Sequence, residues 1–187
     1  NKICVGKISK LETDQFSEDL LISHYREVEI LSKLNHPCII KFIGYSPINF
    51  ENEESPVIFT EFTPEGTLAD VLKLERKSLS PDKWNNTKKL INIYGIALSM
   101  MYLHHLDIIH RDLKPDNILL DKFFYPKLAD FGLSKKISNI KSDTPNAPYG
   151  MKGTMIYCAP EILDKNVYSK ASDVYAFGMI VYEIMTN

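Results

Sequence analysis

Residues 110–117, HRDLKPDN, place three side chains of complementary chemistry within a short stretch. Asp112 can accept a proton or orient a hydroxyl group, Lys114 can neutralise a transferring anionic group, and Asn117 can offer an oxygen to a hard cation. A second oxygen ligand follows at 130–132, where D-F-G sets an aspartate beside a permissive glycine. Two oxygen ligands, one cation and one base suit magnesium-assisted phosphoryl transfer, in which positioning and charge neutralisation do most of the catalysis.

The two motifs differ in specificity. An Asp–Lys pair in a loop is usually a surface ion pair of little worth, and D-F-G alone is too short to identify a site. The pattern H-R-D-x-K-x-x-N fixes five positions, and chance produces it in only about 1 in 10⁴ chains of this size. The longer pattern therefore carries the case for phosphoryl transfer.

The elements that must position these residues begin with strands. Strands are expected at 3–8, 39–44 and 57–61, where β-branched and other apolar residues form short runs. A helix is expected over 20–34, and the sequence Asn-His-Pro at 35–37 ends it, because proline disfavours the α conformation in the residue before it. The apolar residues at helical spacing are Leu21, Tyr25, Val28, Ile30, Leu31 and Leu34.

Helices are expected to dominate the rest of the chain. A short one is expected at 67–74, Ser80-Pro81-Asp82 announces a long one, and a last one opens at 169–173. One face of the long helix is formed by Leu90, Tyr94, Ala97, Met101 and His104, and the apolar side of the last helix by Val174, Phe177, Ile180, Val181 and Ile184. Strands and one helix first, then mostly helices, predict an α+β protein of two unequal lobes.

The composition excludes several classes of protein. The 187 residues have the length of about one domain. With 44% hydrophobic and 25% charged residues, the chain is neither a disordered tail nor collagen-like. No apolar run reaches the roughly 18 residues of a spanning helix, so membrane insertion by this segment is not expected. The 22 Lys and Arg against 24 Asp and Glu give a net charge of −2, which argues against a nucleic-acid partner.

The cysteines indicate a reducing compartment. Cys4, Cys38 and Cys158 are odd in number and far apart, which matches neither a disulfide framework nor a zinc site. The opening residues lack the long apolar core of a secretory signal. A cytoplasmic location is therefore expected.

At this point the sequence resembles the eukaryotic protein kinase catalytic domain of the Ser/Thr type. HRDLKPDN resembles its catalytic loop, D-F-G its magnesium-binding motif, and C-A-P-E at 158–161 the end of its activation segment, in the family's order and over essentially the whole chain. The resemblance implies a two-lobed α+β fold. Residues 1–62 would form the small N-lobe, without its Gly-rich loop, and the hinge, and residues 63–187 the mainly helical C-lobe.

The resemblance implies catalytic and metal-binding roles. Asp112 would be the catalytic base, Lys114 would stabilise the migrating γ-phosphoryl group, and Asn117 and Asp130 would hold Mg²⁺. Thr154, in the sequence GTMIYCAPE, lies where Ser/Thr kinases place a threonine that bonds to the catalytic Asp and Lys. Lys114 and Thr154 together favour Ser/Thr acceptors over tyrosine.

The resemblance also implies residues that bind ATP. Lys7 would contact the α- and β-phosphates, and Glu27 would pair with it. Lys2 and Lys10 are weaker alternatives, because Lys7 alone follows an apolar, strand-like run. Val5 stands where the family usually has an alanine against the adenine, and it could still form an apolar wall there.

The hinge and the spine complete the implied site. Thr60 would be the gatekeeper, the backbones of Glu61 and Phe62 would bond to adenine, and Leu119 would cap the ring from below. The implied regulatory spine consists of Leu31, Phe42, His110 and Phe131.

Regulation and loop anchoring are implied by two further residues. Arg111 would receive a phosphate from the activation segment, and Asp173 would tie down the backbone of the catalytic loop. The candidate phosphate acceptors are Ser134, Ser138, Ser142, Thr144 and Tyr149. Segments such as SDVYAFGMIVYEIMT look most like the tyrosine-kinase-like group of Ser/Thr kinases.

The sequence departs from the family pattern at both ends. No G-x-G-x-x-G precedes Lys7, and the chain stops before the family's last helices, so a partial domain is expected, which on its own would bind ATP weakly. The implied function is an ATP- and Mg²⁺-dependent protein Ser/Thr kinase acting in signalling. A pseudokinase or scaffold is the alternative, favoured by the incomplete nucleotide lid and by Val5-Gly6. A small-molecule phosphotransferase is disfavoured by Thr154 and the A-P-E sequence.

Overall fold

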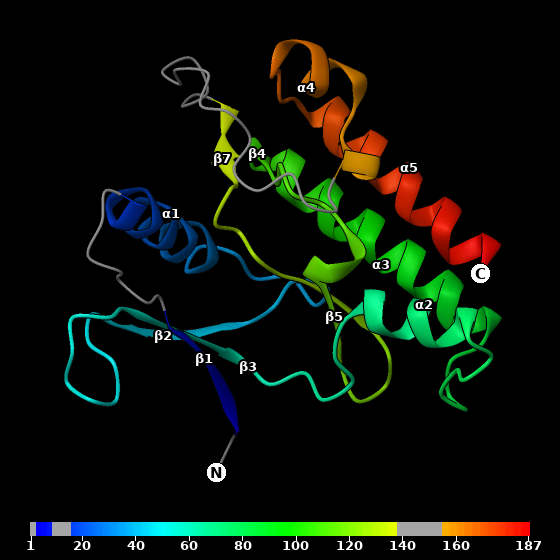
Figure 1. The fold of residues 1–187 in the computed structure, drawn as a ribbon, viewed down its shortest axis with the longest axis horizontal. Coiled ribbons are helices and arrows are strands. Elements are labelled where there is room, and N and C mark those ends of the chain that lie inside the picture. Colours follow the sequence, from blue (N-terminus) through cyan, green and yellow to red (C-terminus); the bar gives the residue numbers. More distant parts are fainter. Residues whose placement is uncertain (1–2, 9–15, 138–154) are drawn as a thin grey trace.

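A smaller, strand-rich part and a larger, helical part make up the fold in the computed structural model, which describes residues 3–8, 16–137 and 155–187 (Figure 1). The α+β class and the unequal lobes predicted from the sequence are confirmed. The elements of the strand-rich part are β1 (Cys4–Ile8), α1 (Phe16–Leu31), β2 (Phe42–Ser46) and β3 (Val57–Glu61).

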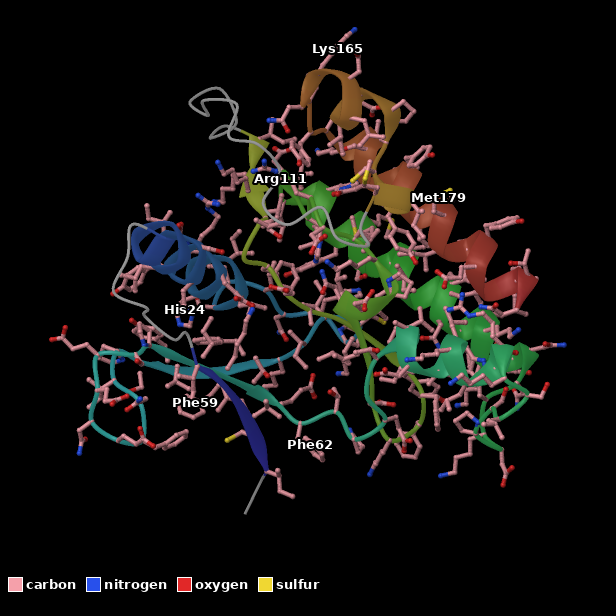
Figure 2. All side chains as sticks on the ribbon, in the orientation of Figure 1. His24, Phe59, Phe62, Arg111, Lys165 and Met179 are labelled. Atoms are coloured by element: carbon pink, nitrogen blue, oxygen red, sulfur yellow. The ribbon has the colours of Figure 1, made fainter. Side chains whose placement is uncertain are left out.

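The strand-rich part is built on an antiparallel sheet in which β3 lies between β1 and β2. The sequence of β3, VIFTE, is rich in β-branched and aromatic residues, and Val57 and Ile58 are fully buried. The register sets Lys7 opposite Ile58 and Val5 opposite Thr60. Helix α1 lies over one face of this sheet, with the buried His24 between them (Figures 1 and 2).

The helical part has four helices in the described ranges, two of them long. Helices α3 and α5 run side by side, and α2 lies beside the C-terminal end of α5 (Figure 1). In addition, β4 pairs with β7 and β5 pairs with β6, which gives two short antiparallel ribbons. Loops connect the strands of these ribbons. The elements are α2 (Leu68–Arg76), α3 (Asn86–His105), β4 (Ile108–Ile109), β5 (Ile118–Leu120), β6 (Pro126–Leu128), β7 (Lys135–Lys136), α4 (Pro160–Lys165) and α5 (Lys170–Thr186), with 3₁₀ turns at Pro115–Asn117 and Met155–Tyr157.

The predicted starts of α2 and α5 are confirmed, and each has a capping box. The Thr67 side chain accepts from the Asp70 amide, and Asp70 in return accepts from the Thr67 amide. Ser169 and Ser172 exchange the same pair of bonds at the start of α5. These bonds satisfy amides that the first helical turn would leave without acceptors.

The predicted start of α3 at Ser80-Pro81-Asp82 is wrong. The helix begins at Asn86, and its cap is Asn85, whose side chain accepts from the Lys88 amide. The preceding residues are held in a turn because Trp84 is inserted into the core, where its indole N–H donates to Glu75 at 3.0 Å.

The predicted apolar face of α3 is exposed rather than buried. Leu90, Tyr94 and Met101 are 59%, 67% and 65% exposed. The buried face combines the apolar residues Ile96, Met100 and Leu103 with small and polar residues that find specific partners there. Asn92 donates to the Phe124 carbonyl at 2.9 Å, and Gly95 leaves room for Pro126, to which an added Cβ would come within 2.5 Å.

Helices α1 and α5 depart from the predicted pattern in the same way. On α1, Tyr25 is exposed and the polar residues His24 and Glu27 are buried. On α5, Val174 is exposed and Asp173 is buried, although Ile180 and Ile184 are fully buried as expected. Glu27 pairs with Lys7, and Asp173 accepts hydrogen bonds from the amides of His110 and Arg111, so both buried carboxylates have partners.

The second strand begins at Phe42, three residues later than predicted. Ile39 instead forms an isolated parallel bridge with Leu128, in which Ile40 N donates to Leu128 O at 2.9 Å and Leu128 N donates to Cys38 O at 2.8 Å. Nearby, the Asn35 amide donates to the Tyr102 hydroxyl at 3.2 Å. These bonds fasten the segment after α1 to the helical part.

Two global properties bear on the class of protein. Cys4, Cys38 and Cys158 are free thiols. Across the described ranges, every helix is too short or too polar to cross a membrane.

Candidate active site

Lys7 joins three elements at one point. Its Nζ lies 2.8 Å from Glu27 Oε2 on α1 and 3.0 Å from Asp130 Oδ1, which follows β6. The predicted pairing of Lys7 with Glu27 is confirmed. The contact of Lys7 with Asp130 was not predicted, because 123 residues separate the two.

The pKa values of these three groups are coupled. Burial alone would lower the pKa of Lys7, but Glu27 and Asp130 outweigh it, so that the pKa is raised. Burial would raise the pKa of Asp130, but Lys7 outweighs it and lowers the pKa. For Glu27, burial dominates and raises the pKa against the pull of Lys7. The result at neutral pH is a protonated Lys7 beside an ionised Asp130.

The loop after β4 brings Asp112, Lys114 and Asn117 together. Lys114 Nζ lies 2.8 Å from Asp112 Oδ2. Asn117, at the end of a 3₁₀ turn, donates through Nδ2 to Asp112 O at 2.8 Å and to Asp112 Oδ2 at 2.9 Å. The Asp112 carboxylate is thereby fixed between an ammonium and an amide, an arrangement suited to a positioned base.

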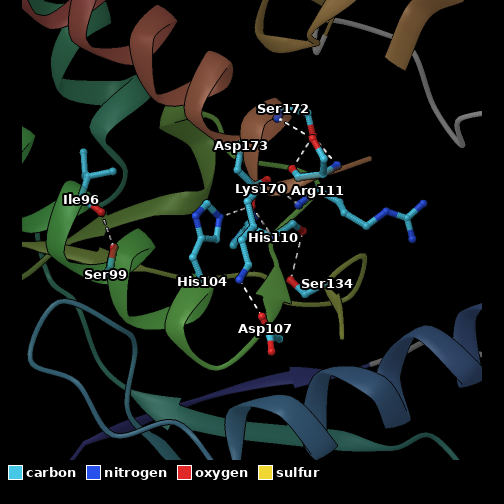
Figure 3. Close-up of polar contacts among 11 residues, drawn as sticks. Ile96, Ser99, His104, Asp107, His110, Arg111, Ser134, Lys170, Ser172 and Asp173 are labelled. Atoms are coloured by element: carbon cyan, nitrogen blue, oxygen red, sulfur yellow. Dashed lines mark hydrogen bonds and ion pairs between the residues drawn. The ribbon is translucent and has the colours of Figure 1, made fainter. Parts of the chain in front are cut away.

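Asp173 anchors the backbone of this loop from α5 (Figure 3). One carboxylate oxygen accepts from the His110 amide at 2.9 Å and the other from the Arg111 amide at 3.0 Å. The predicted anchoring is confirmed. Arg111 has a φ of 71°, a left-handed conformation that costs energy for a residue with a side chain, so the two bonds hold a strained turn.

His104 is a contributor that the sequence did not reveal. Its Nε2 lies 3.0 Å from Asp173 Oδ2, next to the bond from His110 (Figure 3). From its spacing, His104 was expected only to share a face of the long helix with Leu90, Tyr94 and Met101. A histidine one residue before the end of a helix gives no sequence signal that separates this role from an ordinary surface position.

Arg111 and the candidate phosphate acceptors are only partly described. The Arg111 guanidinium lies over the Tyr168 ring, 4.1 Å from its centre. Ser134 is fully buried and donates to His110 O at 3.1 Å, so the prediction that it is a phosphate acceptor is wrong. The other predicted acceptors lie outside the described residues, and so does Thr154. These acceptors are Ser138, Ser142, Thr144 and Tyr149.

The predicted adenine-binding residues lie on both parts of the fold. Val5 and Thr60 are cross-strand neighbours. The Glu61 amide donates to Lys41 O at 3.0 Å, so any bond from Glu61 to adenine would fall to its carbonyl. Phe62, directly after β3, is half exposed (Figure 2). Leu119 lies in β5, in the helical part.

The predicted spine residues are buried together. Leu31, His110 and Phe131 are essentially inaccessible, and Phe42 packs against the same core. The His110 and Phe131 rings meet edge to face, 5.2 Å apart. This contact fixes the residue that follows Asp130.

Asp130 and Asn117 fit the requirements of a divalent metal. Asp130 is ionised and its side chain is 47% exposed, so its carboxylate can still meet a ligand. The side-chain nitrogen of Asn117 donates both of its hydrogen bonds to Asp112. The side-chain oxygen of Asn117 therefore points away from Asp112. Mg²⁺ is commonly held by one or two such oxygens together with phosphate groups. In the described part of the chain, no three His, Cys, Asp or Glu side chains form a metal cage.

Comparisons with known proteins agree with this geometry. The sequence profile described as "Protein kinase domain" matches residues 1–187. The chain is 36% identical over 185 residues to a protein kinase and PP2C-like domain-containing protein of Arabidopsis thaliana, covering 91% of this chain and 26% of the relative. It is 34% identical over 187 residues to a serine/threonine-protein kinase of Dictyostelium discoideum (99% and 13%). It is 39% identical over 164 residues to cysteine-rich receptor-like protein kinase 6 of Oryza sativa subsp. japonica (86% and 22%). The chain thus spans about a quarter or less of the length of these relatives.

Proposed function

Because the chain belongs to the protein kinase family, we propose that it forms the catalytic centre of an ATP-dependent protein serine/threonine kinase. In this proposal the γ-phosphate of Mg-ATP is transferred to Ser or Thr hydroxyls of a protein substrate, in cytoplasmic signalling. The observation that carries the proposal is the double contact of Lys7 Nζ with Glu27 and Asp130, at 2.8 and 3.0 Å. It unites a phosphate-binding cation and a metal ligand from opposite parts of the fold.

Asp112 and Lys114 are proposed to act on the reacting groups. Asp112 accepts the proton of the substrate hydroxyl as that oxygen attacks phosphorus. Lys114, 2.8 Å from Asp112, balances the negative charge of the phosphoryl group in flight. The bonds from Asn117 hold the carboxylate in one orientation, so that it does not have to be ordered during the reaction.

Lys7, Glu27 and the metal ligands are proposed to position the nucleotide. Lys7 binds the α- and β-phosphates, and Glu27 fixes the direction of the ammonium. Mg²⁺, held by Asp130 and Asn117, would supply further neutralisation of phosphate charge. Val5 forms an apolar wall for adenine, its cross-strand neighbour Thr60 is the gatekeeper, and Leu119 of the helical part caps the ring.

The acceptor class rests on Lys114 and Thr154, two residues of the Ser/Thr pattern. The names of the similar proteins from Dictyostelium and other organisms include serine/threonine-protein kinases, which supports this choice. Membership of the tyrosine-kinase-like group is proposed on other segments, such as SDVYAFGMIVYEIMT at the end of the chain.

A pseudokinase or scaffold is the competing proposal, raised by the Val5-Gly6 pair before Lys7. Gly6 has an explanation in packing, since an added Cβ would lie 3.1 Å from Val57 and 3.4 Å from Phe59. Its presence therefore reflects close packing of β1 on β3 and does not require loss of catalysis.

The test is transfer of labelled γ-phosphate from Mg-ATP to peptides that each contain a single Ser, Thr or Tyr. It is run with residues 1–187 and with a longer form extended through the flanking sequence. Asp112→Asn should reduce transfer by about 10²-fold or more, because the base is lost. Asp116→Asn, an exposed aspartate in the same loop, is the matched control and should retain activity.

The outcomes separate the two proposals. Transfer to Ser or Thr peptides that disappears in Asp112→Asn and survives in Asp116→Asn supports the kinase. Saturable binding of Mg-ATP without transfer by either form of the protein supports the pseudokinase. Transfer only to Tyr peptides would contradict the acceptor class.

A further inference from the structure

A hydroxyl group on helix α1 holds the D-F-G segment, residues 130–132, from the strand-rich side. Ser23 Oγ donates to Gly132 O at 2.9 Å, across 109 residues of sequence. Ser23 lies four residues before Glu27, so the two side chains share one face of the helix. Figure 1 shows α1 beside the segment that leads into β7. The helix therefore meets the D-F-G segment at two points, through Glu27 by way of Lys7 and through Ser23 directly.

The space around Gly132, and not its backbone angle, explains why this residue is a glycine. Its φ lies outside the left-handed region that favours glycine. A Cβ added at Gly132 would lie 2.8 Å from Ser23 Oγ, which is too close for two non-bonded atoms. The next nearest atoms would be Asp130 Oδ1 at 3.5 Å and Glu27 Oε2 at 3.8 Å, which are ordinary contacts. The hydroxyl of Ser23 therefore fills the space in which any other residue would place its side chain.

Asp130 needs to be held in place, because its backbone is strained. Its φ is 60°, a left-handed conformation that residues with a side chain rarely adopt. The Phe131 ring, directly after it, packs edge to face on His110 at 5.2 Å. The carboxylate of Asp130 is held through Oδ1, which lies 3.0 Å from Lys7 Nζ. The third restraint is the bond from the α1 hydroxyl to Gly132 O, which fixes the backbone two residues after the strained one.

We propose that Ser23 is a positioning residue, whose hydroxyl holds Gly132 and through it sets the direction of the Asp130 carboxylate. This role rests on the proposed function, in which Asp130 binds the divalent metal of Mg-ATP. Asp130 Oδ1 borders Gly132, so a rotation of the segment at Gly132 also turns the carboxylate. A neutral hydrogen bond makes a modest net contribution, so its loss should shift the local equilibrium about 2- to 10-fold and leave the fold intact.

The first test is the hydrogen exchange of the Phe131 amide, measured by NMR and corrected for intrinsic rates. This amide lies in the middle of the D-F-G segment, so its exchange reports on local opening. Ser23→Ala should speed it about 2- to 10-fold, because the bond to Gly132 is lost. Ser32→Ala is the matched control and should not change it. The Ser32 hydroxyl also donates to a carbonyl, Glu29 O at 3.2 Å, but it is exposed in the turn after α1.

The second test is the binding of a fluorescent ADP analogue, with Mg²⁺ and with EDTA, to residues 1–187 and to the extended form. Mg²⁺ should tighten binding by the parent, because the metal joins phosphate groups to Asp130. Ser23→Ala should reduce this gain about 2- to 10-fold and leave binding in EDTA unchanged, whereas Ser32→Ala should change neither. A role confined to stability would instead weaken binding equally under both conditions.

A double-mutant cycle with Gly132→Ala tests whether the two residues act as a pair. In the parent, the new Cβ would displace the Ser23 hydroxyl, so Gly132→Ala alone should speed exchange of the Phe131 amide about as much as Ser23→Ala does. In the Ser23→Ala protein that space is free, so the same change should add less than about twofold. Effects that multiply would show that the two residues act independently.

The outcomes decide the proposal. Faster exchange, a smaller gain from Mg²⁺ and a non-additive cycle support it. It is overturned if exchange in Ser23→Ala equals that of the parent, if the gain from Mg²⁺ stays the same, or if the cycle is additive. A parent that binds no nucleotide in either form would contradict the proposed function alone. Exchange and the cycle need no nucleotide, so they would then decide whether Ser23 holds the segment.

Discussion

Replacing Asp173 by alanine should unfold the protein more easily, because this carboxylate satisfies groups that water cannot reach. Asp173 is 2% exposed, and it accepts from the amides of His110 and Arg111 at 2.9 and 3.0 Å. His104 contributes a third contact at 3.0 Å. With alanine, the two amides would lose their acceptors, and the left-handed turn at Arg111 would lose the bonds that hold it.

The size of the effect follows from these bonds. A hydrogen bond to a charged acceptor contributes about 1.5–3 kcal/mol, so the two amides account for roughly 3–6 kcal/mol. Removal of a buried carboxylate also removes its desolvation cost, which offsets part of this loss. We therefore expect a loss of about 3 kcal/mol in the free energy of unfolding. For a chain of this length that is a decrease of about 6–12 °C in Tm.

The assay is urea unfolding followed by circular dichroism and by the fluorescence of Trp84, which is the only tryptophan and is buried. Asp164→Ala is the matched control, because the side chain of Asp164 is 74% exposed and should contribute less than about 0.5 kcal/mol. Asp173→Asn keeps one acceptor oxygen and should lose about half as much stability as Asp173→Ala.

Two results would refute the reasoning. One is an Asp173→Ala variant whose unfolding midpoint equals that of Asp164→Ala. The other is equal loss in Asp173→Asn and Asp173→Ala, since it would show that the charge matters and the hydrogen-bond geometry does not.

Further predictions concern packing, nucleotide binding and pH. Gly95→Ala should destabilise the protein by about 1–2 kcal/mol in urea unfolding, because the new Cβ would lie 2.5 Å from Pro126 and the overpacking outweighs the better helix propensity. Gly178→Ala, with nothing within 4 Å, should instead stabilise it by about 0.5–1 kcal/mol, and a loss of stability there would contradict the argument. Lys7→Met should weaken binding of a fluorescent ATP analogue about tenfold or more, whereas Lys33→Met, an exposed lysine in the turn after α1, should not. The Asp130 carboxyl should titrate below its ordinary pKa of 3.8 in carbon-13 NMR spectra. Its pairing therefore adds stability at pH values above 3.8 that is lost as the pH falls through the folded-state pKa. Lys7→Met should move this titration upward, and an unchanged value would rule out Lys7 as the cause.

The sequence was sufficient to predict the motifs and the elements that carry them. The strand at β3, the starts of α2 and α5, the Lys7–Glu27 pair and the anchoring by Asp173 all agree with the structure. The Lys7–Glu27 pair and the role of Asp173, whose partners lie 20 and 63 residues away, followed from the resemblance to the kinase family. The strand and the helix starts depend on local propensity and on capping residues. Such signals survive without knowledge of the tertiary contacts.

The prediction failed where buried polar residues reverse the hydrophobic pattern. On α3, Asn92 and Gly95 face the core because they meet the Phe124 carbonyl and the Pro126 ring, while Leu90 and Tyr94 face outward. Periodicity assigns the apolar side to the core and cannot detect a polar side with well-matched partners. His104 was missed for the same reason, since its partner, Asp173, lies 69 residues away.

The bridge between Ile39 and Leu128 makes the C-terminal end of α1 a pivot. The sixteen residues of α1 span about 24 Å at 1.5 Å per residue. If the helix turns by about 10° around its fastened end, the far end sweeps about 4 Å. Glu27, four residues from the Leu31 end, moves only about 1 Å. A lever of this form converts a wide movement at the Phe16 end of α1 into a fine adjustment of the carboxylate that meets Lys7.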